Sequence, residues 1–139
     1  MFLDSNEPKQ AHASQRLHDE QIAWLGSTRP DGRPHMVPVW FLWHEEKLLV
    51  FSRPTSQKVR NLKQNPAVWL SLDNTGGGHD VVMIEGTAEL PAARTLDPML
   101  TAYVEKYAEG IKGLGMTPEI MTATYSQAIV ITPLKLRQM

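Results

Sequence analysis

Apolar residues in the first half of the chain come in short runs separated by polar turns. Residues 37–43 read VPVWFLW and residues 48–52 read LLVFS, and β-branched and aromatic residues of this kind favour strands. Residues 22–28, IAWLGST, form a similar run. Between the first two strands, residues 29–32 (RPDG) predict a reversal, because Pro fixes φ and Gly tolerates positive φ. A polar turn at residues 44–47 then separates the second strand from the third.

Pro38 lies inside the second predicted strand, where it removes a hydrogen-bond donor from the ladder. Three arrangements accommodate it: an edge strand, a bulge, or a stretch of backbone that faces something other than a neighbouring strand. A bound ligand would suit the third arrangement. From this residue alone, a bulge is the plainer interpretation.

The third strand leads into a predicted basic helix over residues 56–64. Ser and Thr in the preceding segment are good N-cap residues, and Val59 and Leu62 fall at the spacing of a buried stripe. The helix is expected to end at Asn65, because the following Pro66 disfavours helical backbone in the residue before it.

The start of this helix is a candidate phosphate-binding site. Exposed amides at a helix N-terminus favour anions, and Arg53, Lys58 and Arg60 lie close by in the sequence. Residues two apart do not share a helix face, so Lys58 and Arg60 converge on one anion only if the first turn is irregular. An ordinary capped surface helix is the alternative, and it is the commoner outcome.

The same pattern continues beyond the helix. Residues 67–73 (AVWLSLD) and 80–90 (DVVMIEGTAEL) predict two more strands, with a flexible loop at residues 74–79. Gly86 inside the second of them indicates a bulge or a close approach of another backbone.

The last third of the chain is expected to be helical and then extended. Helical character begins at Pro91, and the helix restarts at Asp97-Pro98, a cap pair, to run to about Ala108. Its core-facing residues are Leu100, Tyr103, Val104 and Tyr107. A glycine-rich loop over residues 109–116, a short helix over 117–124 and a sixth strand over 126–136, broken at Pro133, complete the chain.

The N-terminal segment is polar, and we expect residues 1–10 to be flexible. A short helix over residues 11–21 follows, with Ala13, Leu17 and Gln21 on its inner side. Six strands that are mostly linked by hairpins, with helices inserted between them, predict a mainly β barrel or roll and disfavour a doubly wound parallel sheet. We expect a single domain over residues 1–139.

Composition narrows the function classes. The chain has 139 residues and a net charge of −1, from 14 basic and 15 acidic residues, which argues against a broad nucleic-acid-binding surface. It has no cysteine, which excludes disulfides and thiolate chemistry. No apolar run approaches the length of a membrane span and the first residues lack an apolar signal core, so a cytoplasmic protein without a membrane partner is expected.

No familiar catalytic motif is present. The five histidines lack HExxH spacing, so no metal site is expected, and there is no GxSxG element. The glycines at 76–78 lack the spacing of a phosphate-binding loop. The four tryptophans, at positions 24, 40, 43 and 69, can stack on a flat ring or serve the core and subunit contacts. We therefore name no catalytic residue.

Three segments in order, RPDGRPHMVPVWFLW, LLVFSRPTSQKVRNLKQNPAVWLSLD and DVVMIEGTAEL, resemble the pyridoxamine 5′-phosphate oxidase-like, FMN-binding split-barrel superfamily. More closely, they are similar to its deazaflavin (coenzyme F-420)-dependent branch. The resemblance implies a six-stranded antiparallel split β-barrel, with α additions, that forms a homodimer with two cofactor sites at the subunit interface. The Arg and Lys that the oxidase proper carries on the ring-side strand are absent, since VPVWF is apolar.

The resemblance also implies which residues hold the cofactor. By position, Pro38, Val39 and Trp40 match the strand beside the cofactor ring. Phe51 and Ser52 match the strand that leads to the phosphate. The helix start that holds the phosphate corresponds to Ser56, Gln57, Lys58 and Arg60.

Three hypotheses follow. The first is an oxidoreductase that uses coenzyme F-420 to transfer hydride to or from a small organic substrate, since the cofactor carries the chemistry in such enzymes. The second is the same architecture with FMN. The third, from a different class, is a non-catalytic flavin- or deazaflavin-binding protein.

Overall fold

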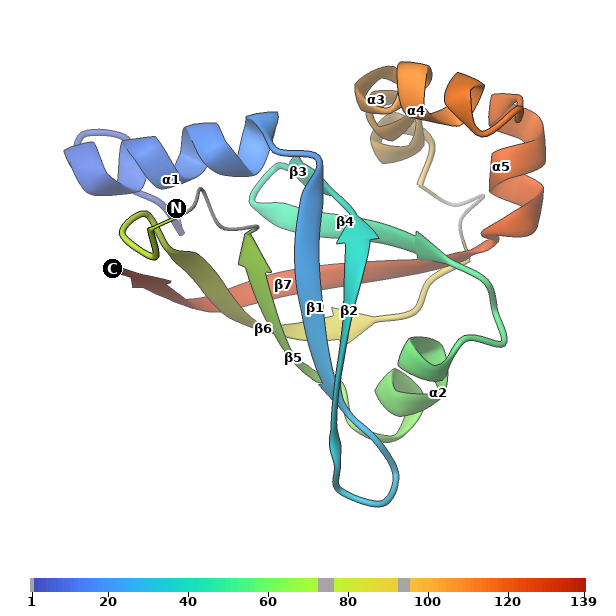
Figure 1. Cartoon of the computed structure of the whole chain (residues 1–139), viewed down its shortest axis with the longest axis horizontal. Helices are drawn as coiled ribbons and strands as arrows, with labels where there is room; N and C mark the ends of the chain where they lie inside the picture. Colours follow the sequence, from blue (N-terminus) through green and yellow to red (C-terminus); the bar gives the residue numbers. More distant parts are fainter. Residues whose placement is uncertain (1, 73–76, 93–95) are drawn as a thin grey trace.

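The computed structural model of the chain describes residues 2–72, 77–92 and 96–139. These residues form one sheet and five helices (Figure 1). The strands are β1 (Ile22–Thr28), β2 (Pro34–Trp40), β3 (Leu42–His44), β4 (Lys47–Ser52), β5 (Ala67–Leu72), β6 (Val82–Glu89) and β7 (Gln127–Gln138). The helices are α1 (Pro8–Asp19), α2 (Gln57–Gln64), α3 (Asp97–Lys106), α4 (Ala108–Gly113) and α5 (Pro118–Thr124).

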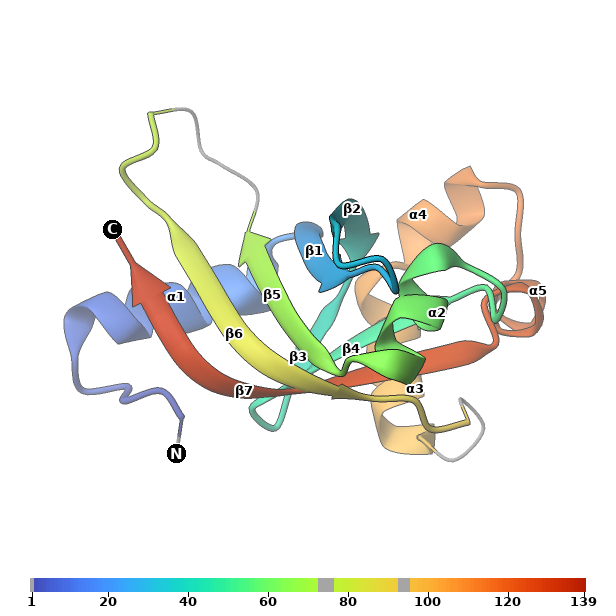
Figure 2. The same ribbon diagram turned by 90° about the horizontal axis from the view of Figure 1, so that it is seen from below.

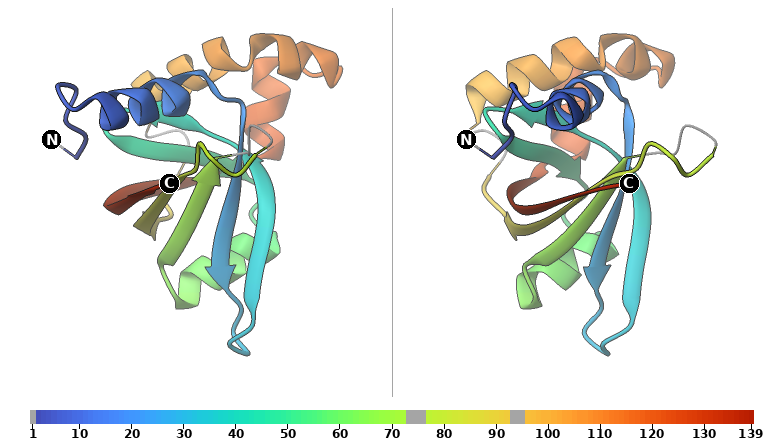
Figure 3. Two further views of the ribbon diagram at one scale, coloured as in Figure 1. Left: turned by 60° about the vertical axis from the view of Figure 1, so that its left-hand side comes forward. Right: turned by 90° about the vertical axis from the view of Figure 1, so that its left-hand side faces the viewer.

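The sheet is antiparallel throughout and has the strand order β2-β1-β5-β6-β7-β4-β3. Its two edge strands, β2 and β3, are consecutive in the chain and only Phe41 separates them. Because one residue spans no more than about 4 Å, the sheet must curl until its two edges approach. The turned views show this curl as a strongly bent, barrel-like sheet (Figures 2 and 3).

The main core fills the inside of the curled sheet. It gathers the inward-facing residues of the strands, and α1 and α2 add one stripe each to it, Ala13 with Leu17 and Val59 with Leu62. All four of these helix residues are buried. The remaining helices cover a different surface: Tyr103, Tyr107, Ile111 and Met121 pack on the outer side of β4 and β7. Figure 1 shows α3, α4 and α5 grouped together, away from α1 and α2.

Most predicted elements are confirmed. The strand over 22–28 and the turn that follows it are found, with Gly32 at a φ of +87° and its amide donating to the Arg29 carbonyl. Ser56 caps α2, and the cap at the other end is Asn65. Of the three arrangements considered for Pro38, the edge strand is correct, since β2 borders the sheet. The bulge at Gly86 is also found, between Glu85 and Gly86.

The number of strands differs from the expected six. The single predicted strand over 37–43 is two strands that meet at Phe41, so the sheet has seven. The last strand is not broken at Pro133: β7 runs continuously, and Pro133 pairs opposite Gly86 at the bulge. The bulge lets the proline remain in the strand because it interrupts the regular ladder at that point.

The glycine-rich segment is the other correction. Residues 109–113 of the expected loop over 109–116 are helical, because α4 extends to Gly113. Ile111 of this helix packs on the outer side of β4 and β7. Tertiary burial of one apolar residue outweighs the low helix propensity of the two glycines in this short helix. Helical character does not begin at Pro91, because Ala92 forms a β-bridge with Gln127.

The N-terminal predictions hold in part. Ala13 and Leu17 are buried, whereas Gln21 is exposed beyond the end of α1. Leu3 is buried and its amide donates to the Glu46 carboxylate. The flexibility of residues 1–10 stays a prediction, and residues 74–76 of the expected loop over 74–79 lie outside the described residues.

Candidate functional site

A groove of about 260 Å³ lies between the edge strand β2, the strand β4 and the C-terminal helical segment. Strand β2 borders the sheet, so its outer side is not covered by another strand. The groove is lined by Pro38, Val39, Trp40, Phe51, Lys58, Tyr103, Leu114, Met121 and Tyr125. Its walls are therefore apolar and aromatic, and one cation lies among them.

Lys58 is that cation. It lies in the first turn of α2, and burial lowers the pKa of its ammonium group. No Asp or Glu of the described part of the chain lines the groove. Among the residues that the structure describes, none forms a hydrogen bond or an ion pair with the ammonium. A partly desolvated and unpaired cation costs free energy unless an anion approaches it, so the groove suits a ligand with a negatively charged group.

Aromatic rings make up much of the wall. The Trp40 indole stacks on the Tyr107 ring, with centroids 4.6 Å apart and planes 4° apart. Phe51 meets Tyr103 edge to face at 4.8 Å. Such flat, apolar surfaces suit a planar ring in the ligand.

Three of the predicted residues lie next to the groove without lining it. Ser52 is buried and its hydroxyl is 2.7 Å from that of Ser56, which accepts a hydrogen bond from the Val59 amide. Gln57 donates to the Asn61 side chain. These contacts fix the strand-to-helix junction and so hold Lys58 at the groove.

Arg60 is placed differently. It is exposed, and its guanidinium donates to the Thr55 carbonyl and to the Gln57 side chain. It does not line the groove, so Lys58 and Arg60 do not converge there. Arg53, also exposed, lies over the Tyr125 ring at 5.1 Å from its centroid.

The helical wall is the part that sequence reasoning missed. Leu114, Met121 and Tyr125 line the groove, although the sequence offered only their apolar character. Tyr103 was expected in the core, and it also lines the groove. Helical spacing indicates which residues are buried, but it does not reveal which distant strands they face.

A larger hollow, of about 500 Å³, lies on the outer face of β2, β1, β5 and β6 and extends to Leu134 of β7. Four large apolar side chains are exposed on it: Trp24 (37%), Met36 (62%), Trp69 (39%) and Leu134 (66%). Among the described residues that line it there is no Lys or Arg, and the one carboxylate is that of Glu85. Despite its size, this face does not suit an anionic ligand; we call it the outer apolar face.

Two further observations concern metals and membranes. Within residues 2–72, 77–92 and 96–139, no group of three or more His, Asp or Glu side chains is arranged to hold a metal ion. No helix in that part of the chain is long and apolar enough to cross a bilayer.

Fold and groove together define a split β-barrel protein in which an apolar, aromatic groove carries a lysine that has no acidic partner among the described residues. The chain belongs to the pyridoxamine 5′-phosphate oxidase family, whose sequence profile matches residues 10–139. The fold is thus that of a flavin-binding family. A comparison with curated protein sequences gives no match.

Solved structures of similar fold have different functions. An F420 reductase is 24% identical, with a TM-score of 0.71 over 89% of this chain and 94% of that chain. A Listeria innocua protein, provisionally assigned as a pyridoxamine 5′-phosphate oxidase, is 20% identical, with a TM-score of 0.72 over 96% and 98%. The haem storage protein HutZ from Vibrio cholerae is 18% identical, with a TM-score of 0.72 over 95% and 93%. At these identities the similarity shows the shared fold alone.

Proposed function

We propose that this protein is an oxidoreductase that binds the deazaflavin coenzyme F-420 in the groove between β2, β4 and the helical segment. One observation carries the proposal: Lys58, partly buried and unpaired among the described residues, lies in a groove of aromatic walls. A phosphorylated, planar cofactor supplies both of the features that the groove lacks, an anion for the lysine and a flat ring for the walls.

Each predicted residue then has a role. Pro38, Val39 and Trp40 would hold the ring and Lys58 would hold the phosphate, while Phe51 is also part of the groove wall. Ser52, Ser56 and Gln57 would support the helix start, whose first amides have no partner within the helix. Arg60 would contribute to cofactor binding only indirectly, because its guanidinium donates to the Thr55 carbonyl and to the Gln57 side chain.

The cofactor, when bound, supplies hydride transfer to or from a small organic substrate. The protein's own groups position it and exclude water. Among the described residues, no carboxylate or histidine lines the walls to serve as a general base for proton transfer. Burial raises the pKa of the Tyr103 hydroxyl well above its ordinary value, which keeps it protonated.

We also propose that two copies of the chain pair through the outer apolar face. Exposed patches of this kind mark interaction sites. Met36 on this face and Pro38 in the groove are two residues apart on β2 and thus point to the same side of the strand. A second copy on the face would therefore lie beside the groove. The groove alone is slightly smaller than a typical ligand pocket of about 300 Å³ or more, which also supports completion by a partner.

FMN is the alternative cofactor. Like F-420, FMN has a planar ring and a phosphate. The family profile that matches this chain is named after pyridoxamine 5′-phosphate oxidase. The strand beside the proposed ring position is apolar and lacks the Arg and Lys of the oxidase proper. This favours an F-420-dependent enzyme over one that oxidises pyridoxamine phosphate. A non-catalytic binding protein is the second alternative, and the haem storage function given for the Vibrio neighbour favours it. A cytoplasmic location stays a prediction.

Cofactor titration tests the proposal. Purified protein is titrated with F-420, FMN and haem, with absorbance and fluorescence as the readouts, and then assayed for turnover of reduced F-420 with a panel of small organic acceptors. We expect saturable binding of F-420 and multiple turnovers with at least one acceptor. Tight binding of FMN but not of F-420 would refute the choice of cofactor. Tight binding with no turnover on any acceptor would support the binding protein instead.

A further inference from the structure

We infer that Tyr107 and Gly110, in the helical segment between β6 and β7, position the Trp40 indole and thereby determine how well a planar ligand fits the groove. The inference rests on the proposed function, since it concerns the same groove. It assigns a role to residues that do not themselves line the groove, and it makes the α3–α4 segment a determinant of ligand affinity.

Tyr107 holds one face of the indole and the backbone beside it. Its side chain is almost fully buried and stacks on Trp40 with nearly parallel planes. Its hydroxyl accepts a hydrogen bond from the Phe41 amide at 2.7 Å. The single hydroxyl proton is donated either to the Gln21 carbonyl at 2.7 Å or to the Phe41 carbonyl at 2.8 Å.

Lys106, the preceding residue, completes this arrangement. Its ammonium group donates to the Phe41 carbonyl at 2.8 Å and lies 4.0 Å from the centroid of the Phe41 ring. Both backbone polar groups of Phe41 are thus bonded to side chains at the end of α3, at the point where β2 stops and β3 begins. Because Phe41 follows Trp40 directly, α3 fixes the main chain that carries the indole.

Gly110 sets the distance between α4 and the indole edge. A Cβ atom at this position would be 2.9 Å from Cη2 and 3.1 Å from Cζ2 of Trp40, closer than carbon atoms pack without displacement. Only glycine therefore allows α4 to lie this close to the ring. At Gly113, in the same helix, a Cβ atom would meet nothing within 4 Å.

Trp40 links these contacts to the ligand. The indole is half-buried and lines the groove together with Lys58 and Phe51. Tyr107 blocks movement of the ring toward its own side, so a side chain at position 110 must shift the indole within the groove or push α4 away. Either change alters the space for a planar ring, because interiors this well packed transmit small displacements.

The test uses the full-length chain and two matched glycine substitutions. Gly110→Ala adds a methyl group against Trp40, and Gly113→Ala adds the same group to the same helix in open space. Dissociation constants for F-420 and FMN are measured for both variants. We expect Gly110→Ala to weaken binding about tenfold, as overpacking against a fixed ring implies, and Gly113→Ala to change it less than about twofold.

Two more variants show whether the effect passes through the indole. In a Trp40→Phe background the contacting ring atoms are absent, so Gly110→Ala should no longer weaken binding beyond the effect of Trp40→Phe itself. A purely structural role for Gly110 predicts the same loss in both backgrounds. If Gly110→Ala does not fold, Tyr107→Phe gives the test: it keeps the stacked ring, removes the hydroxyl, and should weaken binding about threefold.

The outcomes separate the inference from the function on which it rests. Wild-type protein that binds neither probe refutes the proposed function and the inference with it. Wild-type protein that binds a probe, together with unchanged affinity in Gly110→Ala, refutes the inference alone. So does an equal loss of affinity in the wild-type and Trp40→Phe backgrounds, or, where Tyr107→Phe is used instead, wild-type affinity in that variant.

Discussion

Lys58 occupies an environment that favours its neutral form, yet it has no recorded acidic partner in the described part of the chain. Desolvation without compensation lowers the pKa of its ammonium group. A desolvated charge without a partner costs free energy, and the approach of an opposite charge removes this cost. At the scale of single residues, this uncompensated cation is the strongest indication of a ligand in the molecule.

Substitution of Lys58 should therefore separate binding from stability. We expect Lys58→Ala to weaken cofactor binding by about 1–3 kcal/mol, the range for a charge-assisted hydrogen bond. The free energy of unfolding without cofactor should change little, because no described residue forms a hydrogen bond or an ion pair with the ammonium. Equilibrium titration and chemical denaturation of the same preparations measure the two quantities.

Lys63→Ala is the matched control, since Lys63 is exposed on the same helix and does not line the groove. Its affinity should equal that of the wild type. Unchanged affinity for every cofactor in Lys58→Ala would remove Lys58 from the site.

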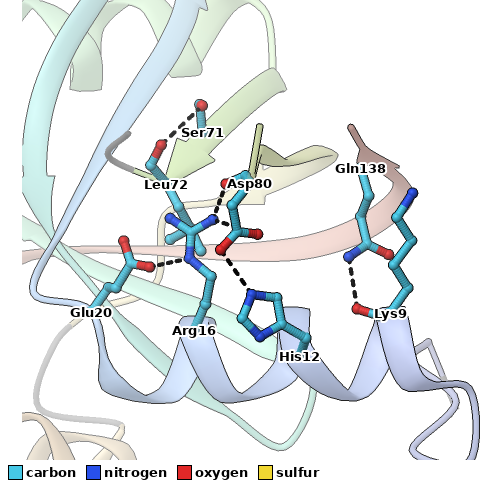
Figure 4. A network of polar contacts seen from close by, with 8 residues as sticks. All are labelled: Lys9, His12, Arg16, Glu20, Ser71, Leu72, Asp80 and Gln138. Carbon is cyan, nitrogen blue, oxygen red and sulfur yellow. Dashed lines mark hydrogen bonds and ion pairs between the residues drawn. The ribbon is translucent and has the colours of Figure 1, made fainter. Parts of the chain in front are cut away.

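Among the elements, α1 is attached to the sheet by a polar network at the start of β6 (Figure 4). Arg16 is buried, and its guanidinium donates to the Glu20 carboxylate and to the Asp80 carbonyl. The Nε2 atom of His12 lies 2.8 Å from the Asp80 carboxylate. At the far end of the helix, Gln138 of β7 donates to the Lys9 carbonyl. These contacts tie the N-terminal helix to strands that are distant in the sequence.

The pH dependence of stability should report this attachment. The hydrogen bond from His12, followed by the charge of Arg16, lowers the pKa of the Asp80 carboxyl below its ordinary 3.8. A carboxyl with a depressed pKa stabilises the folded state above its unfolded pKa, and this contribution is lost as the pH falls through the folded value. Asp80→Asn should thus lower the melting temperature at neutral pH.

The difference between wild type and Asp80→Asn should shrink as the pH falls below about 3.8, the ordinary pKa of the carboxyl in the unfolded chain, and then through its lower pKa in the folded state. Thermal melts across a pH series measure it. Glu105→Gln, at an exposed position on α3, is the control and should show no such dependence. A constant difference at all pH values would contradict a role for the Asp80 charge.

The bulge between β6 and β7 depends on a second glycine. A Cβ atom at Gly86 would be 2.7 Å from Cγ2 of Ile131 and 2.8 Å from the Thr132 carbonyl oxygen. We expect Gly86→Ala to destabilise the fold by about 1–3 kcal/mol, because one of the two contacts is backbone and cannot rotate away. Urea denaturation measures the change.

Gly26→Ala is the comparison, since its Cβ would meet its nearest neighbours at an ordinary 3.6 Å. It should leave the urea midpoint nearly unchanged. Equal midpoints for Gly86→Ala and the wild type would mean that the two strands separate at the bulge without cost.

At the scale of the whole molecule, the curled sheet has two outer surfaces, one covered by helices and one exposed. Helices α3 to α5 cover the side formed by β4 and β7, where they bury Tyr103 and Tyr107. The side formed by β2, β1, β5 and β6 has no such cover among the described residues and exposes the outer apolar face. The groove lies where the two surfaces meet along β2, which is why the proposed cofactor site and the proposed dimer share a strand.

A charge on the outer apolar face should therefore disrupt both pairing and binding. We expect Leu134→Glu or Met36→Glu to convert a dimer to a monomer and to weaken cofactor binding, because a buried unpaired carboxylate opposes association. Light scattering after size exclusion measures the mass. Ile120→Glu, at an exposed apolar position on α5 outside this face, is the control and should remain dimeric. A monomeric wild type would contradict the pairing.

Local sequence determined the elements with strong signals. The turn at residues 29–32, the cap at Ser56 and the end of α2 at Asn65 were predicted correctly, because each depends on backbone preferences of a few adjacent residues. The β character and the antiparallel barrel also followed from the sequence and its resemblance to a family, whereas the cofactor-binding role of the residues on β2, β4 and α2 stays a prediction. The break at Phe41 did not, since it is made by Tyr107 and Lys106 from 65 or 66 residues away.

Only the tertiary structure decided which charges and walls form the groove. The sequence placed Lys58 and Arg60 together as candidates, whereas packing leaves Lys58 in the groove and engages Arg60 at the helix start. The tertiary structure also brings Tyr103, Met121 and Tyr125, which are distant in sequence from β2 and β4, to the groove. The physical reason is the same in each case: hydrophobic periodicity specifies that a residue is buried, while the partner that buries it is set by how a curled sheet folds distant segments against one another.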